Sequence, residues 1–78
     1  MVWQKVVNFR FDRKEDKYEL ELENKKGKRY KVRTDFGSAD LIAYEWINYS
    51  HYRSEDLWAD VEFVGPGRVV VNDVGWRW

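Results

Sequence analysis

The segment Lys17–Thr34 most constrains how this chain folds, because it alternates apolar and charged residues on both sides of a glycine. Before the glycine, Tyr18, Leu20 and Leu22 alternate with Glu19, Glu21 and Glu23. After it, Tyr30 and Val32 alternate with Arg29, Lys31 and Arg33. A period of two is the pattern of a half-buried strand, so the segment predicts a β-hairpin.

The turn sets the register of this hairpin. Lys25-Lys26-Gly27 suits a three-residue loop in which Gly27 takes the left-handed conformation, so that Asn24 faces Lys28. The expected pairs are then Leu22–Tyr30 and Leu20–Val32 on one face, and Glu23–Arg29, Glu21–Lys31 and Glu19–Arg33 on the other. Every pair on the second face joins opposite charges, which supports this register.

The segment Val2–Phe11 predicts a further strand, antiparallel to the first arm of the hairpin. The expected cross-strand pairs are Phe11–Tyr18, Phe9–Leu20, Val7–Leu22 and Arg10–Glu19. The last of these extends the charged face into a ladder of Arg10, Glu19 and Arg33. Lys5 interrupts the apolar alternation, which favours a strand that begins at a sheet edge.

A helix is predicted after this meander, over Ala39–Tyr52. Either Asp35 or Ser38 suits its N-cap, and its end is expected near Tyr52 or Arg53. The stripe expected to face the sheet is Ala39, Ile42, Ala43, Trp46, Tyr49 and Ser50. Leu41, Tyr44, Ile47 and Tyr52 extend the apolar character around the flanks.

A second hairpin is expected after the helix. Leu57–Val64 alternates, with Leu57, Ala59, Val61 and Phe63 predicted inward and Trp58, Asp60 and Glu62 outward. Gly65-Pro66-Gly67 suits a type II turn, and Val69–Val71 forms the middle of the last strand. Asn72-Asp73 predicts a bulge or kink in that strand.

These elements predict an α+β fold in the order β-β-β-α-β-β. The expected architecture is an antiparallel sheet or half-open barrel with one helix on its apolar face. The 78 residues (1–78) suffice for a single domain. A chain this short buries little surface, and its high aromatic content, 18% of all residues, is the expected compensation.

Charge and cysteine content bear on location and partners. The chain has no cysteine, no signal segment and no long apolar run, from which we expect a cytoplasmic protein without membrane contact. Its net charge is zero, but residues 1–34 hold 11 Lys/Arg against 6 Asp/Glu, whereas residues 35–78 hold 3 against 8. The chain is therefore a charge dipole along its sequence.

The first candidate site is a group of aromatic residues in the second half. Trp58 has outward parity, and Trp76 and Trp78 share one parity in the last strand. Tryptophan is enriched at binding hot spots, so these residues, with Tyr44 and Tyr52 at their edge, predict a protein-binding surface. The alternative interpretation is that they fill a second small core.

The second candidate site is basic. Lys25, Lys26, Lys28 and Lys31 lie in or beside the turn of the first hairpin and predict contact with the phosphates of single-stranded nucleic acid. The alternative interpretation is a solvated turn, since the glutamates of the facing strand already engage Arg29, Lys31 and Arg33.

No motif predicts catalysis, a cofactor, a metal site or a small-molecule substrate. His51 is the one histidine, and with nearby carboxylates it makes a poor zinc ligand set. We therefore expect a protein that is not an enzyme.

The order of hairpin, helix and hairpin, with an acidic and Trp-rich second half, resembles small phage-type inhibitors. That resemblance implies binding to a host enzyme. Three hypotheses remain open: a protein-interaction module, including one that associates with itself; a single-stranded nucleic-acid-binding domain; and a designed or scaffold domain without a ligand. The absence of cysteine and the regular charge register favour the designed origin, and the aromatic excess speaks against it.

Overall fold

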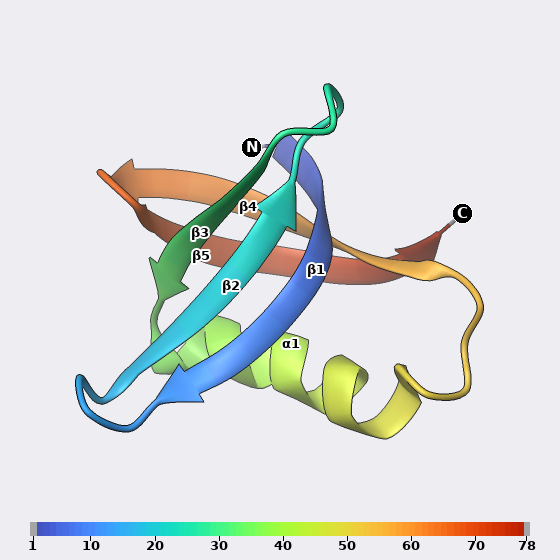
Figure 1. Cartoon of the computed structure of the whole chain (residues 1–78), viewed down its shortest axis with the longest axis horizontal. Coiled ribbons are helices and arrows are strands. Elements are labelled where there is room, and N and C mark those ends of the chain that lie inside the picture. Colours follow the sequence, from blue (N-terminus) through green and yellow to red (C-terminus); the bar gives the residue numbers. More distant parts are fainter. Residues whose placement is uncertain (1, 78) are drawn as a thin grey trace.

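The computed structural model describes residues 2–77 and contains five strands and one helix (Figure 1). They are β1 (Val2–Asp12), β2 (Lys17–Glu23), β3 (Arg29–Thr34), α1 (Phe36–Tyr49), β4 (Asp56–Gly65) and β5 (Arg68–Arg77). This order confirms the predicted β-β-β-α-β-β sequence of elements. The strands do not form an open sheet or half-open barrel, however. They close into a barrel in the order β1-β2-β3-β5-β4.

The closure depends on a parallel pair that the sequence did not predict. β5 pairs antiparallel with β4 along most of its length, and it also pairs parallel with β3 through Arg33–Arg68 and Thr34–Val69. The last strand therefore does not meet the first. Instead β4 pairs with β1, through residues that include Val2–Val61. All other strand pairs are antiparallel, so the sheet is mixed.

The β2–β3 hairpin has the predicted register throughout. Leu22 faces Tyr30 and Leu20 faces Val32, and the three predicted charge pairs are cross-strand partners. Gly27 has a φ of +83°, the left-handed conformation expected of it. The backbone N–H of Asn24 donates to the carbonyl of Lys28 over 3.0 Å, which closes the loop as predicted.

β1 contains a bulge at Val7, which corrects part of its predicted register. The pairs from Asn8 onward match the prediction, but Val6, not Val7, faces Leu22. The extra residue reverses the alternation, so Val6 is buried and Lys5 turns outward beside Glu23. The bulge thus explains why Lys5 interrupts the apolar pattern of the sequence.

The β4–β5 hairpin follows the prediction at its start and departs from it near the turn. Leu57, Ala59 and Val61 are buried as expected, but Phe63 is exposed and stacks on Tyr30 with ring centroids 6.3 Å apart. Phe63 is the last paired residue of β4 before the register shift at the turn. The bulge or kink predicted at Asn72-Asp73 is confirmed, because Asn72 is the extra residue between two consecutive strand pairs.

α1 begins three residues earlier and ends three residues earlier than predicted. Asp35 is the N-cap, and its side chain accepts from the backbone N–H groups of Gly37 and Ser38. Ser38, the alternative cap, lies inside the helix, and its Oγ accepts a hydrogen bond of 2.8 Å from the Val71 N–H. After Tyr49 the chain turns, and the Tyr49 carbonyl accepts from the backbone N–H groups of Tyr52 and Arg53.

The core lies between the barrel strands and the inner side of α1, which runs beneath the strands in Figure 1. The helix contributes Ser38, Ala39 and Ile42 as buried residues. The buried apolar cluster consists of Val6, Leu20, Leu22, Val32, Ile42, Leu57, Ala59, Val61, Val69 and Val71.

Candidate interaction face

The outward side of α1 carries large apolar side chains that the barrel leaves exposed. Phe36 is 70% exposed, Tyr44 61% and Ile47 68%, and Leu41 is exposed to a lesser degree. At 100° per residue Leu41 and Tyr44 fall opposite Ile42 and Ala39, and Ile47 and Phe36 lie on the flank between that side and Ala39. The Phe36 ring also meets the Tyr18 ring of β2 edge-on, with ring centroids 6.0 Å apart. We call Phe36, Leu41, Tyr44 and Ile47 the outer helix face.

The local sequence explains why these residues point outward. The side of α1 that meets β5 holds the small residues Ser38 and Ala39, and only small side chains permit the hydrogen bond from Val71 to Ser38. That contact fixes the rotation of the helix. Ile42 and Trp46 still reach the core from this side of the helix, whereas Leu41, Tyr44 and Ile47 do not and remain exposed.

Tyr44 and Tyr52, the two tyrosines predicted for the protein-binding site, lie on α1 and just beyond its end. Tyr44 belongs to the outer helix face, and Tyr52 lies beyond the helix end and is highly exposed. The Tyr44 ring meets the Tyr49 ring edge-on at 6.1 Å, and the Tyr44 hydroxyl raises the pKa of Tyr49. The guanidinium of Arg53 lies 5.9 Å from the centre of the Tyr49 ring. Aromatic groups therefore continue past the helix end.

Trp58 and Trp76, two of the predicted tryptophans, lie on opposite sides of the β4–β5 hairpin. Trp76 faces Leu57 across the hairpin and packs against the core, and its Nε1 donates to Glu45 over 3.2 Å. Trp58 is the neighbour of Leu57 in β4, so it lies on the opposite side of the hairpin. It is half-buried, and its Nε1 is buried without a partner among the described residues. Trp78 lies outside the described residues.

The lysines of the second predicted site are exposed. Lys25, Lys26 and Lys28 lie at the tip of the β2–β3 hairpin, and Lys31 points outward from β3. Within residues 2–77, none of the four lysines forms an ion pair. The structure therefore brings three of them together at the tip, and Lys31 lies apart on the strand.

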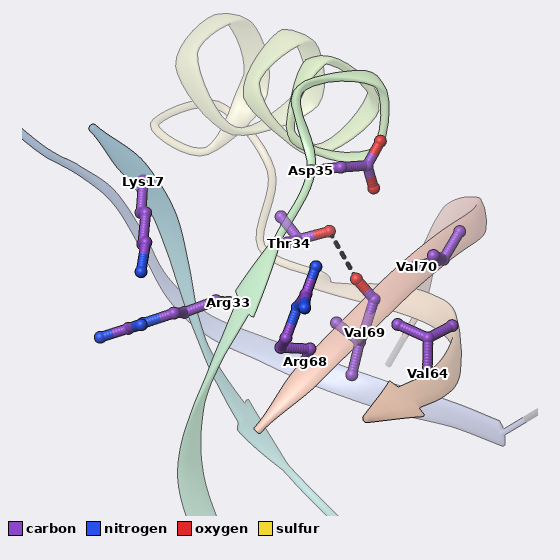
Figure 2. A pocket seen from close by; sticks show the side chains of 8 residues that line it. All are labelled: Lys17, Arg33, Thr34, Asp35, Val64, Arg68, Val69 and Val70. Atoms are coloured by element: carbon purple, nitrogen blue, oxygen red, sulfur yellow. Dashed lines mark hydrogen bonds between the residues drawn. The ribbon is translucent and has the colours of Figure 1, made fainter. Parts of the chain in front are cut away.

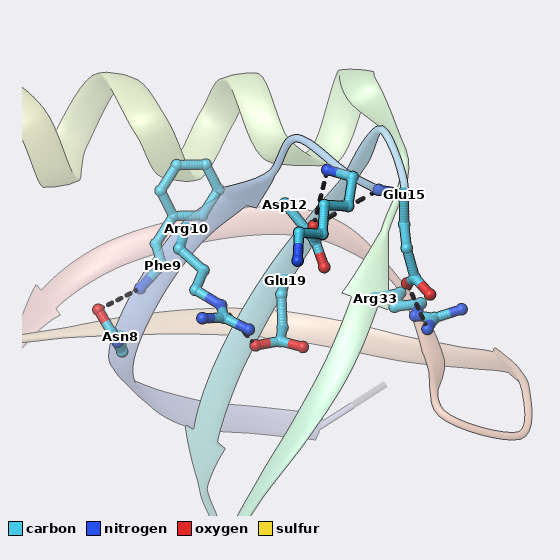
Figure 3. Close-up of polar contacts among 8 residues, drawn as sticks. Asn8, Phe9, Arg10, Asp12, Glu15, Glu19 and Arg33 are labelled. Atoms are coloured by element: carbon cyan, nitrogen blue, oxygen red, sulfur yellow. Dashed lines mark hydrogen bonds and ion pairs between the residues drawn. The ribbon is translucent and has the colours of Figure 1, made fainter.

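The charged face of the barrel is paired less regularly than the register suggests. Glu23 contacts Arg29 at 2.9 Å and Lys5 at 3.1 Å, and these two cations, Arg29 foremost, lower its pKa. Arg10 contacts Glu19 at 2.9 Å (Figure 3). The predicted ladder of Arg10, Glu19 and Arg33 stops at Glu19, because Arg33 pairs with a carboxylate in a loop.

That third member is Arg33, whose Nη2 lies 2.8 Å from Glu15 in the β1–β2 loop (Figure 3). The loop is held in place by Asp12, whose Oδ1 accepts from the backbone N–H of Lys14 over 3.0 Å. Glu15 therefore reaches Arg33 from a loop that the strand register does not describe.

A metal site, a membrane-spanning helix and a family relationship were also sought, and none was found in the described part of the chain. In the described part of the chain, no cluster of His, Asp or Glu could hold a metal ion, and His51 is exposed in the turn after α1. Over the same residues, no helix has the length and apolar character needed to cross a membrane. No protein family, curated protein or solved structure matches this chain.

Proposed function

We propose that this protein is a non-enzymatic interaction module whose outer helix face docks against a second copy of the same chain. The observation that carries the proposal is the exposure of Phe36, Tyr44 and Ile47 on one side of the only helix in residues 2–77. Large apolar side chains gathered on one exposed side of a small domain mark an interaction site, because leaving them in water is unfavourable. Single exposed apolar residues are common on protein surfaces, but three on one side of a helix indicate a binding surface.

The pattern along the helix is self-complementary, which favours a second copy as the partner. Within the helix, Leu41 and Ile47 lie three residues on either side of Tyr44. Two antiparallel copies crossing at Tyr44 therefore bring apolar residues onto apolar residues. A two-fold interface requires this property, since each subunit offers the same surface.

The charges are compatible with the same arrangement. Asp40 lies four residues before Tyr44, and the equivalent position after Tyr44 is Asn48. Antiparallel pairing therefore sets a carboxylate against an amide and not against another carboxylate. The helix contains no basic residue in its last turn that would change this balance.

Sedimentation velocity at increasing protein concentration tests the proposal. We expect a concentration-dependent dimer, weakened about tenfold or more by Ile47→Glu, because a charge in the centre of an apolar contact is left unpaired. Val2→Glu is the matched control, since it places the same charge on an exposed apolar residue in β1. Circular dichroism verifies that both variants fold. A protein that stays monomeric at all concentrations, or equal effects of the two substitutions, would contradict the proposal.

Single-stranded nucleic acid is the second candidate partner, favoured by the barrel architecture. Five-stranded Greek-key barrels of the OB type bind oligonucleotides on the outer face of strands 2 and 3, an analogy of fold alone. Here that face carries Lys31 and Arg33, but also Glu19 and Glu21. It has no aromatic side chain on which a base could stack, because Tyr18 and Tyr30 share the parity of the core residues. This candidate therefore ranks second.

Fluorescence anisotropy of a labelled mixed-sequence oligonucleotide tests this second candidate. Contacts between lysines and phosphates release counterions, so genuine binding weakens steeply as salt rises. Lys26→Gln and Lys28→Gln together would then weaken binding. If anisotropy stays flat at low salt and the protein also stays monomeric, the remaining hypothesis is a scaffold without a ligand.

A further inference from the structure

A pocket of about 520 Å³ lies where β3, the start of α1 and the β4–β5 turn meet (Figure 2). Lys17, Arg33 and Arg68 line it together with Val64, Val69 and Val70. Figure 2 shows the Lys17 and Arg33 side chains on one side of the pocket and the valines on the other, with Arg68 between them. The pocket thus combines a cationic wall with an apolar wall.

Two of these cations are partners in the strand register, although Figure 2 shows the Arg33 side chain extending away from Arg68. Arg33 of β3 is the cross-strand partner of Arg68 of β5, in the short parallel pair that closes the barrel. Like charges placed directly opposite one another are destabilising. The backbone nevertheless holds them there, since the Arg33 N–H donates to the Gly67 carbonyl over 2.8 Å, and the Thr34 hydroxyl donates to the Val69 carbonyl over 2.9 Å.

The positive charge of the pocket is only partly compensated. In the part of the chain that the structure describes, neither Lys17 nor Arg68 has an ion pair or hydrogen bond from its side chain. Arg33 pairs with Glu15, but both side chains are about half exposed, at 47% and 50%. A surface pair of this exposure is weak and can exchange its anion.

The one carboxylate that lines the pocket is already used by the helix. Asp35 Oδ2 accepts from the N–H groups of Gly37 and Ser38, at 3.1 and 3.3 Å, as the N-cap of α1. It does not contact Lys17 or Arg68 in an ion pair. Three cations and one committed carboxylate leave the pocket with a net positive charge.

We propose that this pocket binds a small organic phosphomonoester. The phosphate dianion would lie among Arg33, Arg68 and Lys17, with both arginines turned toward it. Arginine suits this role, because its planar fork donates two parallel hydrogen bonds to phosphate oxygens. The body of the ligand would lie against the valine wall. A bare phosphate fills only a small part of the pocket, whose volume is in the range of small-molecule sites.

The proposal does not depend on the outer helix face, so the two can fail separately. The direct test is an NMR titration of the ¹⁵N-labelled protein at constant ionic strength, following the amides of Arg33, Thr34 and Arg68. The probes are adenosine 5′-monophosphate, inorganic phosphate and adenosine. We expect saturable shifts with the monophosphate, weaker binding of inorganic phosphate, and no binding of adenosine.

Three substitutions in the protein sharpen this titration. Arg68→Gln removes the charge and most of the fork, and we expect about a tenfold loss of affinity for the monophosphate. Arg68→Lys keeps the charge but not the fork, so it should lose affinity by a smaller factor. Glu15→Gln should instead raise affinity, because it removes the carboxylate that competes for Arg33. A purely structural role of these residues predicts no such gain.

Lys26→Gln is the matched control, since it removes one positive charge at the hairpin tip, away from the pocket. The proposal is overturned if adenosine binds as well as its monophosphate, if sodium chloride produces the same shifts, or if Arg68→Gln leaves the affinity unchanged. It is also overturned if an oligonucleotide binds far more tightly than the monophosphate and Lys26→Gln weakens it as much as Arg68→Gln does. That last result would assign the charge to an extended nucleic-acid surface.

Discussion

The hydroxyl of Tyr30 donates a hydrogen bond to Oε1 of Gln4, joining β3 to β1, two strands that are not neighbours in the barrel. Gln4 is one of the few buried polar side chains of the described residues. Partial burial raises the pKa of Tyr30, and the hydrogen bond to Gln4 opposes that shift. A buried polar group needs such a partner, because burial without one is costly.

This bond predicts a specific double-mutant result. Tyr30→Phe should lower the free energy of unfolding by about 1–3 kcal/mol, since it leaves the Gln4 oxygen buried without a donor. Gln4→Met combined with Tyr30→Phe should recover much of that loss, because neither polar group then remains. Urea denaturation measures all three proteins. Equal stability of Tyr30→Phe and the wild type would mean that Gln4 finds another donor.

The bulge in β1 predicts different costs at two adjacent valines. Val6 is buried opposite Leu22, whereas Val7 is the extra residue and is only partly buried. Val6→Ala should lower the free energy of unfolding by about 1–3 kcal/mol, through lost burial and the cavity left behind. Val7→Ala should cost clearly less. The reverse ranking in thermal or urea denaturation would favour an unbulged strand.

The N-cap of α1 predicts a pH-dependent contribution to stability. Hydrogen bonds from Ser38, and then from the Gly37 backbone, hold the pKa of Asp35 below its ordinary value. The folded state therefore binds fewer protons than the unfolded state, so the contribution is complete above the unfolded pKa and is lost as pH falls through the folded pKa. Asp35→Ala should cost about 1 kcal/mol at neutral pH, and this difference should shrink in acid.

Asp35→Asn is the control for this prediction, because asparagine caps helices about as well but does not titrate. It should retain most of the stability at neutral pH. Urea denaturation at neutral and acidic pH compares the three proteins. A loss for Asp35→Ala that stays the same at every pH would show that the carboxylate charge plays no part.

The pair of facing arginines predicts that removing one charge stabilises the ligand-free protein. Arg68→Gln should raise the melting temperature at low ionic strength, because Arg33 no longer faces a like charge. The gain should disappear at high salt, which screens exposed charges. Differential scanning calorimetry at two salt concentrations measures both effects. A salt-independent loss of stability would mean that packing of the Arg68 side chain outweighs repulsion.

The parts of the fold that could be predicted are those in which neighbouring residues determine the geometry. The β2–β3 register follows from a short turn and a period of two, and both lie within Lys17–Thr34. Closure of the barrel could not be predicted in this way. It depends on Thr34 meeting Val69, residues far apart in the sequence that are joined over only two residue pairs. So short a contact leaves no periodic pattern.

The candidate site shows a second limit of local reasoning. The helical stripe predicted to face the sheet is confirmed at Ala39 and Ile42, which are buried, and at Trp46, which packs against the core. The pattern did not show how exposed the flanking residues Tyr44 and Ile47 are, because that depends on which strands cover the helix. Tryptophan content pointed instead to Trp76, which packs on the core and donates to Glu45. Size and aromaticity favour burial as readily as binding.

β3 and β5 are joined by only two residue pairs, so this is the junction at which the barrel opens most easily. Every other junction between neighbouring strands is longer. Parting this one would leave an unbroken sheet in the order β3-β2-β1-β4-β5, with both new edges free. Each edge offers the complement of the other, so two unrolled chains at high concentration could close on each other and exchange their ends, as in domain swapping.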